Sequence, residues 1–197
     1  MTAKTTNIYQ FKITLKEIKP KIWRRIQVPE KYSFWDLHVA IQNAMGWENY
    51  HLHRFEIIDP KTGFKVEIGM PDEEFDDIPI VPEEKAKIAK YFLSTKDKAI
   101  YEYDFGDGWK HEVMLEKILP VVVDDQYPKC IAGERACPPE DCGGVWGYES
   151  LLEIIADREH EEYTDRMEWL GGEFDPEAFD PESVEFEDPK ECKANMM

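Results

Sequence analysis

AIYEYDFGDGWKHEVMLEKI, residues 99–118, is the stretch of sequence that decides the fold. The three residues at its centre, Gly106-Asp107-Gly108, tolerate positive φ, and both flanks are rich in aromatic and β-branched residues. This pattern predicts a β-hairpin with arms at 99–105 and 109–118. Because alternate residues of a strand share one face, His111 is expected to point inward with the apolar residues of its arm.

Further strands and helices are predicted on both sides of this hairpin. Alternating apolar residues predict strands at 9–15, 22–28, 53–58 and 64–68, and the first two of these are expected to pair. Helical spacing predicts helices at 34–45, 88–93, 148–155 and 159–170. Ser33 and Asp36 have the spacing of a capping box at the start of the first helix. The predicted class is α+β, with a mostly antiparallel mixed sheet, flanking helices and a C-terminal helical part.

The chain is expected to form one domain with a short appendage. Its 197 residues and 42% hydrophobic content suffice for a single large core. We expect the domain to span residues 1–182 and to be followed by an acidic, flexible tail at 183–197. The acidic, proline-punctuated stretch 70–84 is predicted to be a solvated loop.

Charge and hydropathy narrow the classes of partner. The 42 acidic residues outnumber the 24 basic ones and give a net charge of −18, which disfavours nonspecific nucleic-acid and anionic-membrane binding. A local basic patch, Lys19, Lys21, Arg24 and Arg25, leaves a DNA-associated role through residues 22–25 as one hypothesis. The sequence contains neither an apolar run of about 20 residues nor a secretory signal, so we expect a cytoplasmic protein with a protein partner.

A cysteine-rich stretch, residues 130–144, is predicted to be a loop and is the first candidate site. Three cysteines within thirteen residues, kept close by prolines and glycines, suit a zinc ion that takes four ligands. The predicted ligands are Cys130, Cys137, Cys142 and His111, with Cys192 and His160 as alternatives to the histidine. The spacing is not that of paired knuckles, and small buried thiols or an internal disulfide would also account for it.

The second candidate site joins two other stretches. His51 and His53 alternate on a predicted strand, while Asp104 and Asp107 flank the hairpin turn. Together with His111, these side chains would suit a metal-dependent hydrolase or nuclease. The competing interpretation is that the aspartates fix the turn and the histidines are structural. Because the sequence holds no complete catalytic set, we favour a non-catalytic binding or accessory domain.

Several unusual motifs occur in an order that points to one family. They are HLHRF at 51–55, YDFGDGWKH at 103–111, CPPEDCGGVWGY at 137–148 and WLGGEFDPEAF at 169–179. With the opening stretch at 9–25, they resemble the plasmid pRi ORF-three-like family over about residues 6–182. The resemblance implies a plasmid, transposable-element or other DNA-related setting. It implies no activity, and it assigns no catalytic residue.

Overall fold

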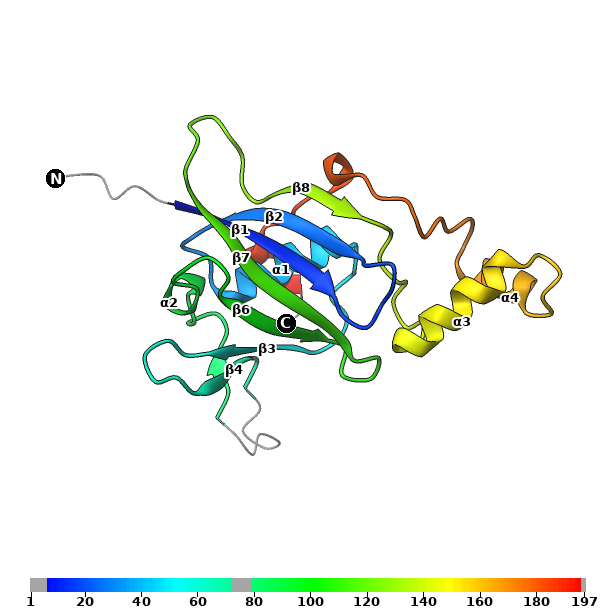
Figure 1. The fold of residues 1–197 in the computed structure, drawn as a ribbon, viewed down its shortest axis with the longest axis horizontal. Coiled ribbons are helices and arrows are strands. Elements are labelled where there is room, and N and C mark those ends of the chain that lie inside the picture. The colour runs from blue at the N-terminus through cyan, green and yellow to red at the C-terminus, as the bar shows by residue number, and fades with distance from the viewer. Residues whose placement is uncertain (1–6, 72–78, 196–197) are drawn as a thin grey trace.

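One sheet forms the framework of the protein in the computed structural model, which describes residues 7–71 and 79–195. The described residues contribute eight strands in the order β5-β4-β3-β6-β7-β1-β2-β8 (Figure 1). The strands are β1 (Asn7–Leu15), β2 (Trp23–Pro29), β3 (His53–Ile58), β4 (Lys65–Gly69), β5 (Val81–Pro82), β6 (Lys98–Tyr103), β7 (Trp109–Pro120) and β8 (Lys129–Glu134). Neighbouring strands are antiparallel except for β4 and β5. The predicted α+β class with a mostly antiparallel mixed sheet is confirmed.

The helices lie on one face and at one end of this sheet. They are α1 (Phe34–Met45), α2 (Ile88–Tyr91), α3 (Gly144–Ala156), α4 (Tyr163–Trp169), the 3₁₀ turn η1 (Pro181–Ser183) and α5 (Pro189–Asn195). In Figure 1, α1 lies behind the strands and α3 and α4 extend beyond one end of the sheet. Among the described residues, no helix is long and apolar enough to cross a membrane.

The two predicted hairpins and the predicted helix cap are confirmed. Strands β6 and β7 pair from Tyr103↔Trp109 outward, and β1 pairs with β2. Ser33 Oγ accepts a hydrogen bond from the Asp36 amide at 3.2 Å, and the Asp36 carboxylate accepts one from the Ser33 amide at 2.7 Å. The helix ends at Gly46, whose φ of +90° is the left-handed conformation that glycine adopts without strain.

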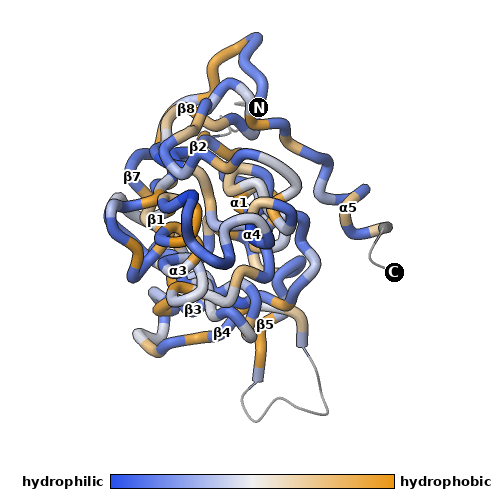
Figure 2. Tube along the Cα trace, turned by 90° about the vertical axis from the view of Figure 1, so that its right-hand side faces the viewer, coloured by the Kyte–Doolittle hydropathy of each residue, from blue (hydrophilic) through white to orange (hydrophobic). Residues whose placement is uncertain are grey.

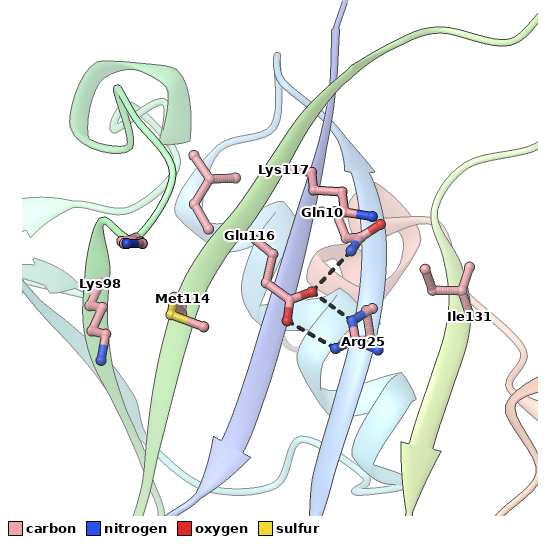
Figure 3. A pocket seen from close by; sticks show the side chains of 9 residues that line it. Gln10, Arg25, Lys98, Met114, Glu116, Lys117 and Ile131 are labelled. Atoms are coloured by element: carbon pink, nitrogen blue, oxygen red, sulfur yellow. Dashed lines mark hydrogen bonds and ion pairs between the residues drawn. The ribbon is translucent and has the colours of Figure 1, made fainter.

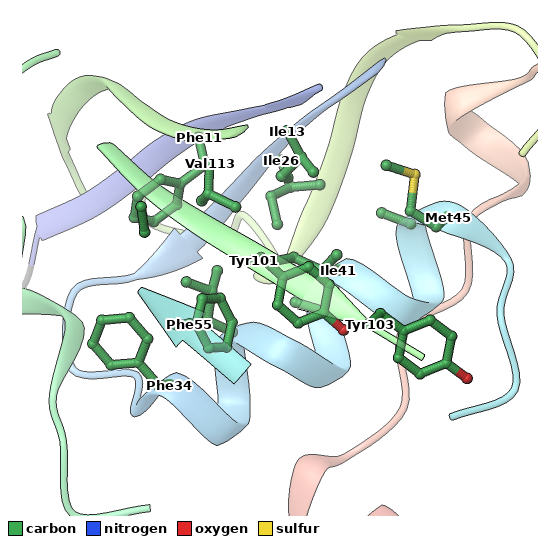
Figure 4. Close-up of a cluster of buried hydrophobic side chains, with 14 of the residues drawn as sticks. Phe11, Ile13, Ile26, Phe34, Ile41, Met45, Phe55, Tyr101, Tyr103 and Val113 are labelled. Carbon is green, nitrogen blue, oxygen red and sulfur yellow. The ribbon is translucent and has the colours of Figure 1, made fainter. Parts of the chain in front are cut away.

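The core fills the space between α1 and the sheet. Figure 4 shows side chains from β1, β2, β3, β6 and β7 directed toward the helix: Phe11, Ile13, Ile26, Phe55, Tyr101, Tyr103 and Val113, opposite Phe34, Ile41 and Met45. All of these side chains are buried. Tyr101 and Tyr103 also carry hydroxyls, so the hairpin that decides the fold brings polar atoms to the edge of the core.

The C-terminal segment covers the side of α1 that faces away from the sheet. The Trp35 indole N–H donates to the Pro189 carbonyl at 2.8 Å, and Asn43 exchanges side-chain and backbone hydrogen bonds with Glu187 at 3.1 and 3.2 Å. Figure 2 shows the chain descending along one side of the molecule to α5. The predicted tail therefore includes a helix that lies against the domain; its predicted flexibility stays a prediction.

The structure corrects four local predictions. Cys130 lies in β8, which pairs with β2, and not in a loop. Glu83 is buried, although its stretch was predicted to be solvated; residues 72–78 of that stretch lie outside the described residues. Helix α2 ends at Tyr91, and α4 begins at Tyr163 without a fully buried residue. The errors at Cys130 and Glu83 arise because a contact distant in sequence overrides local polarity. The helix boundaries differ because local turns, with hydrogen bonds to Asp97 and Asp157, replace the predicted helix ends.

Candidate metal centre

His51 lies at the centre of the one group of potential metal ligands found among the described residues. Its Nε2 atom is 3.1 Å from Asp141 Oδ1, 3.5 Å from Glu140 Oε2 and 3.8 Å from Asp104 Oδ2. The ligand atoms of His51, Asp104 and Asp141 all lie within 4.8 Å of one another. Nε2 is buried and makes no hydrogen bond in the described structure, so the imidazole nitrogen is directed at carboxylates alone.

The end of β6 holds the first carboxylate in place. Asp104 follows the last residue of β6 with a φ of +54°, its amide donates to the Leu52 carbonyl at 2.9 Å, and its Oδ1 accepts from the Gly106 amide at 2.9 Å. These bonds leave Oδ2 facing His51. The predicted turn-fixing role of Asp104 is therefore combined with a place in the ligand group.

A second carboxylate is fixed by the neighbouring tyrosine. Glu140 accepts hydrogen bonds from the Tyr103 hydroxyl at 2.9 Å and from the Glu48 amide at 2.8 Å. Burial and the adjacent Glu140 carboxylate raise the pKa of Tyr103, so the hydroxyl stays protonated and donates. Asp141 is the exposed member of the group, with 69% of its side chain accessible.

The cysteine-rich stretch reaches this position by docking on the hairpin turn. The Gly143 amide donates to Asp107 Oδ2 at 3.1 Å, and the Trp47 indole N–H donates to the Pro138 carbonyl at 2.9 Å. At Gly144 a side chain is excluded, because a Cβ atom there would lie 2.5 Å from the Asp107 carbonyl oxygen. Three stretches singled out by sequence therefore meet at one place.

The spacing of these atoms fits a shared cation. Carboxylate oxygens and imidazole nitrogens bind zinc-like ions at about 2.1 Å, which places neighbouring ligands of a tetrahedral ion about 3.4 Å apart. The three distances from His51 Nε2 bracket that value. A mixed nitrogen and oxygen donor set suits Zn²⁺ or Mn²⁺, and three protein ligands leave a coordination position open.

Only two of the five side chains in the predicted hydrolase set lie in this group. His51 and Asp104 belong to it. The His53 ring is buried elsewhere, beside Glu83, and the Asp107 carboxylate bonds the Gly143 amide. Sequence reasoning did not select Glu140 or Asp141, because their separation of more than thirty residues from the hairpin turn leaves no local signal. The positive φ of Asp141 becomes visible only in the structure.

The four predicted zinc ligands are not gathered in the same way. No three of Cys130, Cys137, Cys142 and His111 have ligand atoms within 4.8 Å of one another in the described structure. Burial raises the pKa of Cys142 to about 12 and raises that of Cys137 further, which favours neutral thiols. Of the alternatives, Cys192 donates toward Glu187 and His160 Nδ1 accepts from the Glu162 amide.

A buried arginine occupies the neighbourhood of these thiols. Arg24 is 1% exposed and donates to the carbonyls of Trp23, Ala44 and Glu134 at 2.8–3.0 Å. Its guanidinium lies 3.7 Å from the centre of the Phe179 ring. Arg24, a member of the basic patch seen in the sequence, is therefore a buried structural cation. Its charge favours the thiolate forms of Cys130 and Cys137 against the larger effect of burial.

His111 points inward as predicted and has an unusual environment. It is fully buried, and neither ring nitrogen makes a hydrogen bond within the described residues. The rings of Trp47 and Tyr101 lie 5.3 and 5.4 Å away, between ring centres. Burial lowers the pKa of His111 to about 3, so the imidazole is neutral and retains a lone pair.

A buried polar network that sequence reasoning missed lies between α1 and β3. The rings of His38 and His53 stack at 3.4 Å with an angle of 2° between their planes. His53 Nε2 is 2.7 Å from Glu83 Oε2. Burial lowers the pKa of His53 to about 3 and raises that of Glu83 to about 7. Both groups are therefore favoured in their uncharged forms.

Donors and acceptors can be assigned for the hydrogen bonds on the His38 side of this network. His38 Nε2 is 2.7 Å from the Asn49 side-chain oxygen, so this nitrogen carries the proton. His38 Nδ1 then accepts from the Tyr101 hydroxyl at 2.8 Å, and that hydroxyl accepts from Gln42 Nε2 at 2.8 Å. A histidine at a buried helical position of the sequence was the available signal, and it is weak because a core histidine is commonly structural.

Comparison with known proteins identifies the family of this chain. The family model of the plasmid pRiA4b ORF-3-like proteins matches residues 7–183. The chain belongs to this family. The match ends at the last residue of η1, so α5 and the segment leading to it lie beyond the matched region.

Two relatives match most of the length of this plasmid pRiA4b ORF-3-like protein. It is 38% identical over 166 residues to the uncharacterized protein y4hQ of Sinorhizobium fredii, covering 84% of this chain and 81% of that protein. It also resembles the crystal structure of a protein of unknown function from Methanosarcina mazei Go1. There the TM-score is 0.86 and the identity 53%, over 93% of this chain and all of the other. The predicted family is confirmed. The two relatives are described as uncharacterized and of unknown function, so they assign no activity.

Proposed function

We propose that this family member is a non-catalytic, metal-binding accessory domain whose cation lies between His51, Asp104 and Asp141, with Glu140 beside them. The observation that carries the proposal is the convergence of their ligand atoms within 4.8 Å on one imidazole nitrogen. Carboxylates brought this close repel one another, and a divalent cation relieves the repulsion. The proposed setting is the cytoplasm, with a protein partner.

Manganese binding tests this proposal. Mn²⁺ prefers carboxylate and imidazole ligands over thiolates, so it separates this site from the cysteines. Calorimetric titration of the full chain should give one Mn²⁺ site, weakened at least about tenfold by Asp141→Asn and by His51→Ala. Asparagine tolerates the left-handed backbone at Asp141, so this variant keeps the fold.

A charge-matched variant is the control for this titration. Glu149→Gln removes one exposed carboxylate from α3, outside the ligand group, and should leave the affinity for Mn²⁺ unchanged. Equal affinity in Asp141→Asn and in the unmodified protein would refute the proposed site, as would the absence of Mn²⁺ binding.

Structural zinc in the cysteine-rich stretch is the second candidate. The observation that favours it is the buried His111 ring, whose two nitrogens make no hydrogen bond in the described structure. Binding Cys130, Cys137, Cys142 and His111 to one ion would require the thiols to approach one another and lose protons. We expect about one zinc per chain in protein purified without added metal, and a lower melting temperature for Cys137→Ser.

Two results of the zinc measurement would contradict this candidate, and one variant serves as its control. Well under one zinc per chain, together with unchanged melting of Cys137→Ser, would remove this candidate. Asp141→Asn should leave the zinc content unchanged, because it alters the other site.

The two remaining functions have separate requirements. A hydrolase or nuclease would use the proposed manganese site and its open coordination position. A DNA-associated protein would bind DNA with an affinity that falls as the salt concentration rises.

A further inference from the structure

We propose that the sheet face opposite α1 carries a second binding site, for a small molecule that joins an anionic head group to an apolar body. A hollow of about 740 Å³ lies on this face over β6, β7, β1, β2 and β8. It is lined by Gln10, Arg25, Lys96, Lys98, Met114, Leu115, Glu116, Lys117 and Ile131 (Figure 3). Pockets for small ligands commonly have volumes of about 300–1000 Å³.

The charge of the hollow is opposite to that of the whole protein. Four of its lining residues are basic and one is acidic, whereas the chain carries a net charge of −18. Glu116 is paired with Arg25, and Lys98 Nζ is 2.8 Å from Glu112. Lys96 and Lys117 are exposed and make no salt bridge within the described residues. Two uncommitted ammonium groups therefore favour an anionic ligand.

The floor of the hollow is polar and held in place. Arg25 donates to both oxygens of Glu116, at 2.6 and 2.9 Å, and Gln10 Nε2 donates to Glu116 at 2.9 Å. Gln27 in turn donates to Gln10 at 3.0 Å. The Arg25 hydrogen bonds lower the pKa of Glu116, so the pair is charged and fixed at neutral pH. A fixed floor limits the ordering that ligand binding would cost.

Apolar side chains supply the other half of the recognition. Met114 projects from β7 on one side of the Arg25–Glu116 pair, and Ile131 from β8 lies on the other side (Figure 3). Ile131 is 38% exposed. A methionine adapts its shape to different bodies, so the apolar body of the ligand would rest on Met114 or, across the ion pair, on Ile131. The head group would then lie in the field of both rim ammonium groups, Lys96 and Lys117.

The source of the negative charge is either a phosphate or a carboxylate, and matched probes separate them. 1-Naphthyl phosphate, 1-naphthoate and neutral 1-naphthol share one apolar body. We expect the two anions to shift backbone amide signals of β7 and β2 in nuclear magnetic resonance spectra. Either anion should bind at least about fivefold more tightly than naphthol. Whichever anion binds more tightly identifies the head group.

Reversing the charge of a rim lysine tests whether the anion binds in this hollow. Lys117→Glu should weaken binding of the preferred anion at least about fivefold, because the rim then repels the head group. Lys61→Glu makes the same change of charge on the turn between β3 and β4 and should have no effect. Equal binding of naphthol, shifts outside the hollow, or unchanged affinity in Lys117→Glu would each overturn the proposal. Asp141→Asn should bind the anion normally, so this site is tested independently of the manganese site.

Discussion

Glu83→Ala is expected to lower the free energy of unfolding by about 3 kcal/mol, because it leaves the buried His53 imidazole without its hydrogen-bond partner. The Glu83 carboxyl is the partner of His53 Nε2 at 2.7 Å, and both side chains are at most 5% exposed. Truncation also leaves a cavity beside the His53 ring, where the buried carboxyl was. Urea unfolding monitored by circular dichroism measures the change.

The adjacent glutamate is the matched control. Glu84 is 55% exposed and forms its ion pair with Lys193 at the surface. Glu84→Ala should change the free energy of unfolding by less than about 0.5 kcal/mol. Similar losses of unfolding free energy in the two alanine variants would show that the buried Glu83–His53 contact does not stabilise the protein more than a surface ion pair does.

The same pair gives a pH dependence with a defined sign. The pKa of Glu83 is raised from 4.5 to about 7, so its contribution is lost as pH rises through about 7. The pKa of His53 is lowered from 6.5 to about 3, so its contribution is lost as pH falls from 6.5 toward 3. Between pH 4.5 and 6.5 the native and unfolded pairs each hold one proton. The contribution of the pair to stability is therefore flat in this range.

Glu83→Gln exposes the histidine contribution alone. Over the range from pH 6.5 to 4.5 the unfolded variant gains a proton on His53 that the native variant does not take up. Relative to the unmodified protein, its stability should fall by about 2–3 kcal/mol across these two pH units. The contribution of His38 is common to both proteins and cancels in the difference. A difference that is constant with pH would contradict one shared proton in the native pair.

Local sequence signals predicted the framework because its determinants are close in sequence. The Gly106-Asp107-Gly108 turn, the Ser33–Asp36 capping box and the inward direction of His111 each depend on a few neighbouring residues. Alternation and turn chemistry are sufficient for such features. The order of the strands, with β1 between β7 and β2, follows from long-range pairing that alternation does not encode.

The sites were predicted only in part, because they depend on residues brought together from distant segments. His51 and Asp104 were selected as polar residues near strand ends, and they do meet. Glu140 and Asp141 join them only because the cysteine-rich stretch docks on the hairpin turn. Glu83 resembled its acidic neighbours in sequence, and its burial follows from its contact with His53. Composition assigns such a residue to the surface.

Gly147→Ala is the substitution for which helix propensity and tertiary structure predict opposite signs. Gly147 lies in the first turns of α3, where alanine would ordinarily stabilise a helix by about 1 kcal/mol. A Cβ atom at this position would lie 1.9 Å from the Cys142 carbonyl oxygen and 2.8 Å from its carbon. Backbone atoms must move to admit the methyl group, so we expect a net loss of about 3 kcal/mol in the free energy of unfolding.

The displacement should also reach the proposed manganese site, because Cys142 directly follows Asp141. Gly147→Ala is therefore expected to weaken Mn²⁺ binding about tenfold or more, since a ligand carboxylate displaced by an ångström no longer completes the coordination. Ser150→Ala, an exposed change on the same helix, should alter neither quantity beyond its small gain in helix propensity. A more stable Gly147→Ala protein would show that the cysteine-rich stretch is not held against α3. Unchanged Mn²⁺ affinity in a destabilised variant would instead separate the cation site from the docking of that stretch.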